Sequence, residues 1–169
     1  MKRALFTLLA VVSIASALAQ TTDPPSQITD LKWMVGTWTG SGKFAIQGME
    51  MDMTVTITCS IEGQFLKTVA VNDYGAIKME ETQYTGYDAD KKEYFAYSFT
   101  NVSPAPRVQR GKMEGASLVM LSEPWTVMGD TMTARGTTTK VSETKMKMGL
   151  DFKNDDKWDK ASEIELTKK

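Results

Sequence analysis

A run of twelve residues with strict two-residue alternation constrains the fold of this chain more than any other feature. Apolar residues occupy every odd position from Met49 to Cys59, and polar or charged residues occupy every even position from Glu50 to Ser60. Successive side chains of a β-strand point to opposite faces, so this run predicts a strand with one buried face.

The rest of the chain repeats this organisation, with short β-prone runs separated by turns rich in Asn, Asp and Gly. Such turns join neighbouring antiparallel strands. About ten strands in one domain favour closure over an open twisted sheet, so we predict an all-β fold, a single antiparallel β-barrel of about ten strands. Besides the alternating run, strands are expected over residues 37–46, 65–71, 76–86, 93–100, 107–113, 117–121, 131–141, 144–152 and 158–166.

A Gly-x-Trp sequence at the start of the predicted barrel indicates how one end could be closed. Gly36 allows a sharp turn into the sheet, and Trp38 offers a large flat surface that can cover a barrel end. Gly40 and Gly42 lie two residues apart and permit a bend or the close approach of another backbone. An ordinary buried Trp beside a glycine-rich turn is the simpler alternative.

The segment Gly36-Thr37-Trp38-Thr39-Gly40-Ser41-Gly42 resembles the first-strand signature of calycin-type barrels, which include lipocalins and nitrobindin-like domains. Residues 61–66 and 85–88 are similar to landmarks of a bacterial family of exported proteins of unknown function with that fold. The resemblance covers residues 30–168 and implies a closed barrel with an internal cavity, but no single activity. In lipocalins an Arg of the last strand often stacks on the end-closing Trp, and here Lys160 is the expected substitute.

The amino terminus has the features of an export signal. Three residues with two positive charges precede an apolar run, and Ala17-Leu18-Ala19 forms a small-x-small cleavage site. The apolar run is shorter than the roughly 20 residues that a membrane-spanning helix needs. We therefore expect an exported protein, periplasmic or extracellular, with no membrane insertion after signal cleavage. The predicted divisions are a signal peptide over residues 1–19, a disordered leader over residues 20–30 and a calycin-like barrel domain over residues 31–169.

Composition narrows the possible functions. Twenty basic residues against 21 acidic ones, without a basic cluster, argue against nucleic acid as a partner. The chain has no histidine, which excludes Ser-His-Asp and Cys-His sites and the histidine-ligated haem of nitrobindin-like barrels. Cys59, the single cysteine, is expected to be a small buried apolar residue. No catalytic residue, metal or cofactor is predicted.

The predicted function is the binding of a small hydrophobic or amphipathic molecule inside the barrel. Methionine is frequent, and its flexible side chain suits an adaptable cavity wall. The aromatic residues of strand 93–100 share one face, which is assigned to the interior. The predicted ligand-binding residues are Trp38, Met49, Met51, Met53, Phe65, Phe95, Tyr97, Phe99, Arg110, Met146 and Met148.

Charged side chains suggest a polar contact within the same cavity. Glu80 and Glu81 are adjacent on a strand, so one of them could face the interior, where it would need a partner. Arg107 and Arg110 differ in parity, and at most one points inward. Arg110 is chosen, as a group that could hold a ligand carboxylate, because it shares a face with Val108. An exposed edge-strand charge is the alternative.

Three other functions remain open from the sequence. The first is a solid-core barrel that acts through surface contacts, with Trp125 in the loop of residues 122–130. The second is a Cu(I) site built from methionine thioethers, which soft metals prefer. The third is an enzyme that uses Tyr, Glu or Asp, with Glu80 and Glu81 as the residues to test.

Overall fold

Ten strands close into an antiparallel barrel in the computed structural model, which describes residues 23–127 and 129–169. The predicted signal peptide lies outside the described residues. The barrel strands are β1 (Gly36–Ile46), β2 (Met49–Glu62), β3 (Phe65–Asp73), β4 (Lys78–Asp88), β5 (Glu93–Thr100), β6 (Arg107–Glu114), β7 (Ser117–Ser122), β10 (Ala134–Lys140), β11 (Lys145–Asn154) and β12 (Lys157–Lys168). Their order is β1-β12-β11-β10-β7-β6-β5-β4-β3-β2, and β2 pairs with β1 to close the ring. The predicted fold class is confirmed.

In the part of the chain that the structure describes, two short helices and a two-stranded hairpin lie outside the ring. The helix α1 (Ser26–Thr29) and the 3-10 helix η1 (Lys32–Met34) precede β1. The strands β8 (Trp125–Val127) and β9 (Asp130–Met132) form a separate hairpin, where a loop was expected over residues 122–130 and a strand from residue 131. Among the described residues, no helix has the length and apolar character needed to cross a membrane.

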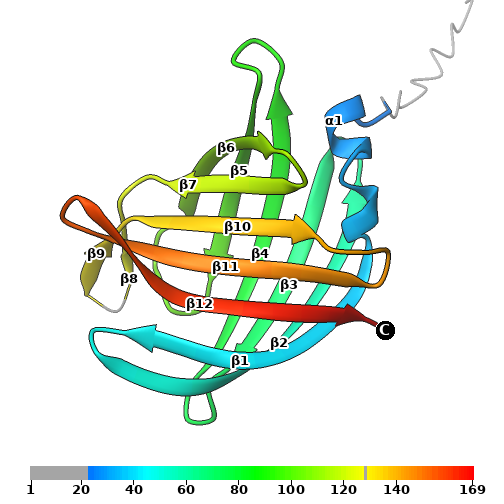
Figure 1. The fold of residues 1–169 in the computed structure, drawn as a ribbon. Coiled ribbons are helices and arrows are strands. Elements are labelled where there is room, and N and C mark those ends of the chain that lie inside the picture. The colour runs from blue at the N-terminus through cyan, green and yellow to red at the C-terminus, as the bar shows by residue number, and fades with distance from the viewer. Residues whose placement is uncertain (1–22, 128) are drawn as a thin grey trace, which may run out of the picture.

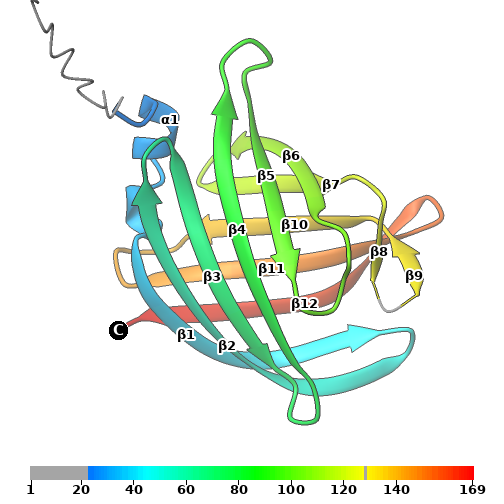
Figure 2. The ribbon, with the colours of Figure 1, turned by 180° about the vertical axis from the view of Figure 1, so that it is seen from behind.

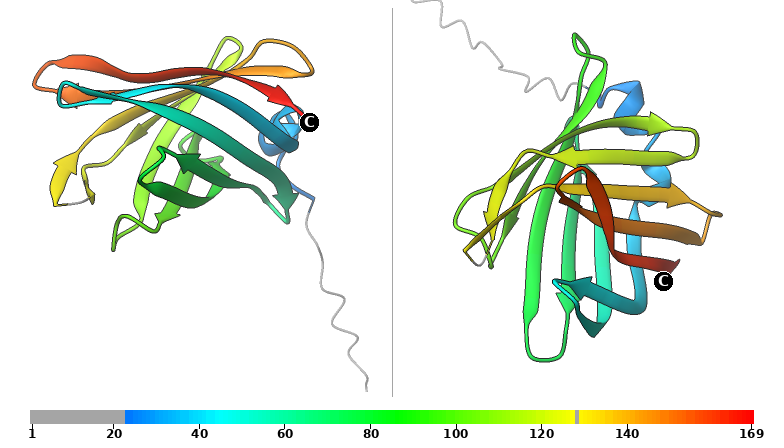
Figure 3. Two further views of the ribbon diagram at one scale, coloured as in Figure 1. Left: turned by 90° about the horizontal axis from the view of Figure 1, so that it is seen from below. Right: turned by 60° about the vertical axis from the view of Figure 1, so that its left-hand side comes forward.

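The strands cross the barrel in two directions. Strands β10, β11 and β12 run across the view of Figure 1, in front of β3, β4 and β5. Figure 2 shows the same crossing from behind. In both views and in the left panel of Figure 3, α1 and the β8–β9 hairpin lie at opposite ends of the molecule. The barrel therefore has an α1 end and a hairpin end.

Residues 26–34, directly before β1, form α1 and η1 and pack against the barrel, whereas residues 20–30 were expected to form a disordered leader. Residues 20–22 lie outside the described residues. Ile28 and Leu31 are 0% and 1% exposed and join the main hydrophobic cluster. The Tyr94 hydroxyl donates a hydrogen bond to the carbonyl oxygen of Gln27 over 3.1 Å. Burial of the Ile28 and Leu31 side chains removes apolar surface from water. This favours packing of the segment against the barrel over an extended, solvated conformation.

The alternating run forms β2 with the predicted faces. Its odd positions from 53 to 59 are at most 5% exposed, whereas the intervening residues Thr54, Thr56 and Thr58 are exposed. Cys59 is buried as expected, and burial raises the pKa of its thiol. This strand therefore supplies a continuous apolar wall to the interior.

Trp38 and Lys168 meet where β1 pairs with β12. Trp38 is fully buried, and the Lys168 ammonium lies 5.1 Å from the centre of its ring. The expectation that Lys160 takes this place is wrong. The register between β11 and β12 shifts at Leu150/Asp151, so the β-bulge changes which residues of β12 face inward, and Lys160 pairs with Glu163 at the surface instead.

Candidate functional site

The interior of the barrel contains a cavity of about 180 Å³ that is partly open to solvent. An engineered protein cavity of about 150 Å³ binds benzene. The space is therefore large enough for a small organic molecule. Its wall is mainly apolar on β2, β7, β11 and β12 and mainly polar on β4 and β6.

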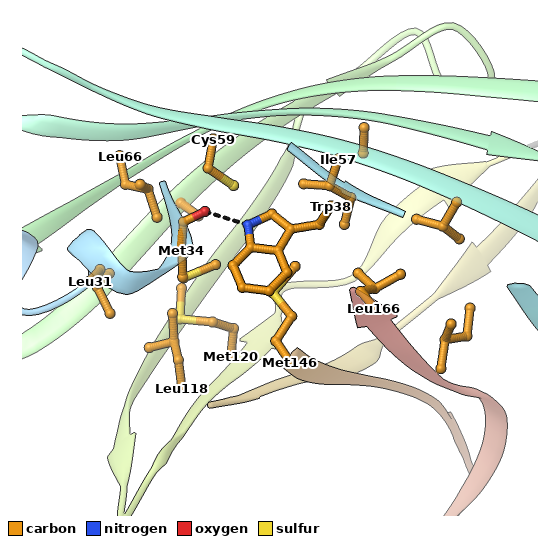
Figure 4. Close-up of a cluster of buried hydrophobic side chains, with 14 of the residues drawn as sticks. Leu31, Met34, Trp38, Ile57, Cys59, Leu66, Leu118, Met120, Met146 and Leu166 are labelled. Carbon is orange, nitrogen blue, oxygen red and sulfur yellow. Dashed lines mark hydrogen bonds between the residues drawn. The ribbon is translucent and has the colours of Figure 1, made fainter. Parts of the chain in front are cut away.

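Trp38, predicted to bind the ligand, lies in the buried core beside η1 and is not among the residues that line the cavity. Its indole Nε1–H donates to the carbonyl oxygen of Met34 over 2.7 Å, which satisfies the one polar atom of a fully buried side chain. Figure 4 shows this bond and the surrounding side chains, among them Ile57, Leu118 and Leu166. Gly40 makes the close approach of β12 possible, because a Cβ at this position would lie 2.5 Å from the carbonyl oxygen of Glu165 on β12. The close backbone approach expected at this glycine is confirmed.

Methionines form a large part of the cavity wall. Three of those predicted from the sequence, Met53, Met146 and Met148, do line the cavity. Unbranched thioether side chains adapt to irregular shapes, so this wall can fit ligands that differ in outline. The methionines that line the cavity are Met34, Met53, Met79, Met120, Met146 and Met148.

The polar side chains on the β4 and β6 side of the cavity form a hydrogen-bonded network. The Ser98 hydroxyl on β5 lies 2.8 Å from Oε1 of Gln83 and 3.5 Å from Oε1 of Gln109. The amide nitrogen of Gln83 donates to the hydroxyl of Thr85 over 3.0 Å. Ser98, Gln109 and Thr85 are buried, at most 5% exposed. Hydrogen bonding among these groups holds polar atoms in an interior that is otherwise apolar.

An ion pair lies beside this network. Arg107 on β6 donates through Nη2 to both carboxylate oxygens of Glu81 on β4, over 2.9 and 3.0 Å. The two side chains are 15% and 12% exposed, and both line the cavity. The Trp125 ring of the β8–β9 hairpin lies 5.3 Å from the guanidinium carbon. The Nε atom of Arg107 is buried and has no hydrogen-bond acceptor among the described residues.

Tyr74, which directly follows β3, also lies near the Arg107–Glu81 ion pair. Its side chain lines the cavity and packs against Phe44 with the ring centres 5.2 Å apart. Burial, and then the charge of Glu81, raises the pKa of Tyr74 to about 12. Both causes disfavour a negative charge in this part of the cavity.

The aromatic residues assigned to the interior lie on the outside of the barrel, so their predicted orientation is wrong. Phe65, Tyr97 and Phe99 are 40%, 41% and 54% exposed. Phe95 lies opposite Gly86 of β4, where a Cβ would collide with its ring and with that of Phe65. These rings cover the glycine from outside, as aromatic residues do for glycines in other sheets. The inner face of β5 carries Tyr94 and the smaller Ala96 and Ser98 instead.

Arg110 and two methionines also lie away from the cavity. Arg110 is on the outer face of β6 and pairs with Glu93 at 3.0 Å and Glu123 at 3.9 Å. Of the two candidate arginines, Arg107 faces inward, and Glu81 is the inward carboxylate. Met49 is 59% exposed and Met51 is half-buried near the β1–β2 turn, outside the cavity wall. Side chains two apart on a strand are separated by about 7 Å, so Met49, Met51 and Met53 do not converge on one point.

Gln83 and Gln109 line the cavity and Ser98 lies within hydrogen-bond distance of both, although none of the three was predicted there from the sequence. A signal for them was present in β5, where Ala96 and Ser98 are the small residues of an otherwise aromatic strand. Small side chains on one face leave room for an interior cavity. That face becomes identifiable as the inner one only when β4 and β6 are placed beside it.

Comparisons with known proteins identify a family and a fold. A family model described as "Protein of unknown function (DUF1579)" matches residues 24–168. The crystal structure of Rv2717c from M. tuberculosis is similar, with a TM-score of 0.68 and 10% sequence identity. The match covers 87% of this chain and 99% of that one. At this identity the likeness shows the fold alone. None of the curated proteins searched matches the chain.

Proposed function

We propose that this chain, which belongs to the DUF1579 family of proteins of unknown function, binds a small apolar or amphipathic molecule inside its barrel. The observation that carries the proposal is a cavity of about 180 Å³ with a methionine-rich wall facing a polar wall. Binding sites for small molecules typically combine an apolar lining with a few fixed polar groups.

Two features of the cavity support binding over simple core filling. A solid core would leave few voids larger than a water molecule. Here Gly136 of β10 lines the cavity, and a Cβ on it would have only the Gln109 amide nitrogen near it, at 3.9 Å. The wall also contains Arg107 and Glu81, whose burial is costly in a barrel that needs only an apolar core.

The test combines native mass spectrometry of the purified protein with calorimetric titration of octan-1-ol. We expect a co-purifying small molecule or saturable binding of the alcohol. Gly136→Leu should fill the cavity and weaken binding at least roughly tenfold, because the new side chain occupies the space of the ligand. Tyr97→Ala, on the outer face, is the matched control and should leave the affinity unchanged.

Two results would contradict the proposal. One is a bare protein mass together with no binding of octan-1-ol. The other is binding that Gly136→Leu leaves intact while the variant remains folded, since the molecule would then lie outside the barrel.

We further propose that the protein is exported, with its signal over residues 1–19. The charged, apolar and small-residue regions of this segment support the proposal. Expression of the full chain in a Gram-negative host should give a product that begins at Gln20 and is released with the periplasmic contents. A product that retains Met1 in the cytoplasm would contradict export.

A second candidate function is contact with a partner through the outer surface. The exposed aromatic residues Phe65, Tyr97 and Phe99 favour it, because exposed apolar patches often mark interaction sites. Trp125, which was expected to make such a contact, is instead half-buried between Arg107 and Phe152. A pull-down that depends on Phe99 but not on Gly136 would favour this function over the cavity.

A further inference from the structure

We infer that the molecule bound in the cavity is uncharged and presents an acceptor oxygen to the side-chain amide of Gln109. This inference rests on the proposed function, since it specifies the ligand of that same cavity. It depends on the charge of the cavity wall and on the hydrogen-bond donors that the wall leaves unused.

The positive and negative side chains of the cavity wall neutralise each other without a ligand. Among the described residues, the charged side chains that line the cavity are Glu81 and Arg107. They pair with each other through two hydrogen bonds of 2.9 and 3.0 Å. A ligand carboxylate would add a negative charge beside Glu81, and the Arg107 guanidinium there is already paired. Burying an unpaired charge is costly, so the wall disfavours anionic ligands.

Tyr74 gives independent support for this reading. Its phenol lines the same cavity, and its pKa is raised by burial and by the charge of Glu81. A phenolate at this position would meet the same two penalties as a ligand carboxylate. The upward shift of the pKa of Tyr74 has the same direction as the expected penalty on an anionic ligand.

The orientation of Gln109 leaves a donor facing the cavity. Its Oε1 lies toward the Ser98 hydroxyl, at 3.5 Å, while that hydroxyl lies closer to Gln83, at 2.8 Å. The Nε2 atom of Gln109 therefore lies on the side of the amide away from Ser98. Among the described residues it makes no hydrogen bond to an acceptor, and it is not one of the fully buried unpaired atoms. It lies 3.9 Å from the position that a Cβ on Gly136 would take, and Gly136 has no side chain to fill that position. An oxygen of a ligand can occupy that space.

Arg107 adds a second donor without an acceptor. Its Nε is buried and unpaired, although its Nη2 is held by Glu81. This atom is covered by its neighbours, so a ligand in the cavity does not reach it. Gln109 is therefore the donor available to a ligand, which matches a carbonyl, ether or ester oxygen.

The test compares three eight-carbon probes at pH 7.5 by ¹H–¹⁵N NMR titration of the full barrel. Octan-2-one is neutral with an acceptor oxygen, octanoate is anionic, and oct-1-ene is neutral without an acceptor. We expect octan-2-one to bind roughly five- to tenfold more tightly than oct-1-ene, the ratio that one net hydrogen bond supplies. Octanoate should bind at least roughly tenfold more weakly than octan-2-one, because its charge is left unpaired.

Gln109→Met keeps the length of the side chain and removes the amide. It should abolish the preference for octan-2-one over oct-1-ene. Lys112→Met, which changes an exposed residue of the same strand to the same new residue, should preserve that preference. If Gln109→Met does not fold, the ranking of the three probes on the unaltered protein still decides the question.

The outcomes separate this inference from the proposed function. Tightest binding of octanoate, or a ketone preference that survives in Gln109→Met, would overturn the inference while the cavity remains a binding site. Equal affinity for octan-2-one and oct-1-ene would do the same. Failure of all three probes to bind would count against the proposed function itself.

Discussion

Arg107 and Glu81 form a two-hydrogen-bond ion pair across β5, between strands β6 and β4, with both side chains at least four-fifths buried. The strand β5 between them contributes the small side chain of Ser98 to this face. The small Ser98 side chain leaves space on the inner face of β5, and the long side chains of Arg107 and Glu81 meet across that space. This geometry fixes the polar side of the cavity and leads to the first prediction.

Glu81→Gln should destabilise the protein strongly. The change leaves the Arg107 charge buried without a counter-ion, and breaking such a pair typically costs about 3 kcal/mol or more. Urea denaturation should show a lower free energy of unfolding by this amount. Glu80→Gln, the exposed neighbour on the same strand, is the control and should change it by less than about 0.5 kcal/mol.

A double replacement sharpens this prediction. Glu81→Leu combined with Arg107→Met removes both charges, and apolar replacements of buried pairs are often neutral or stabilising. The double variant should therefore recover most of the stability lost in Glu81→Gln. Equal stabilities for Glu81→Gln and Glu80→Gln would show that the pair is not buried in solution.

Gly86→Ala should destabilise the barrel, although the position lies on the outer face. The added Cβ would collide with the Phe95 ring, and overpacking of this kind costs about 1–3 kcal/mol. Thermal and urea unfolding measure the loss. Gly149→Ala is the matched control, because the nearest atoms to its Cβ would lie at 3.9 Å.

The same experiment tests the orientation of β5. In a Phe95→Leu background, Gly86→Ala should cost less, since the smaller side chain no longer lies across position 86. Additive effects of the two changes would contradict the contact between Phe95 and Gly86.

Stability should fall as the pH rises from about 10 to about 12. A tyrosine in the unfolded chain ionises near pH 10, whereas the folded state holds the pKa of Tyr74 at about 12. The unfolded state therefore releases this proton first, so the contribution is fully present below pH 10 and is lost as the pH passes through that window. Tyr94, whose pKa is also raised by burial, acts in the same direction.

Urea midpoints measured at several pH values between 9 and 12 would check this dependence. Tyr74→Phe should flatten the decline, because no phenol remains at that position to ionise. Tyr97→Phe removes an exposed phenol from the outer face and should leave the slope as it is in the unaltered protein. An identical slope in all three proteins would rule out Tyr74 as its source.

Much of the fold could be predicted from local pattern. The alternation from Met49 to Ser60 predicted the correct strand, and it predicted the correct buried face from Met53 to Cys59, because successive strand residues point to opposite faces. Trp38 and the glycines after it also have the expected places at a closed end. Each of these features depends on neighbours in the sequence.

The cavity residues were harder to predict because parity gives two faces without saying which one is inside. In β5 the larger aromatic residues suggested the interior, but Gly86 on the adjacent strand needs them outside. In β6 the apolar Val108 suggested the inner face, but Arg107 lies there with Glu81 as its partner. The partner in each case is 9 to 26 positions away, so the decisive contact is not visible within the strand itself.

The sequence alone thus determined that the chain forms an antiparallel barrel of about ten strands with Trp38 at one end, since strand number and turn spacing are local properties. Only the tertiary structure decided which faces of β5 and β6 line the interior and that Lys168, not Lys160, lies over Trp38. The physical reason is that cross-strand register and a single bulge control these orientations, and one shifted residue moves every later side chain to the other face.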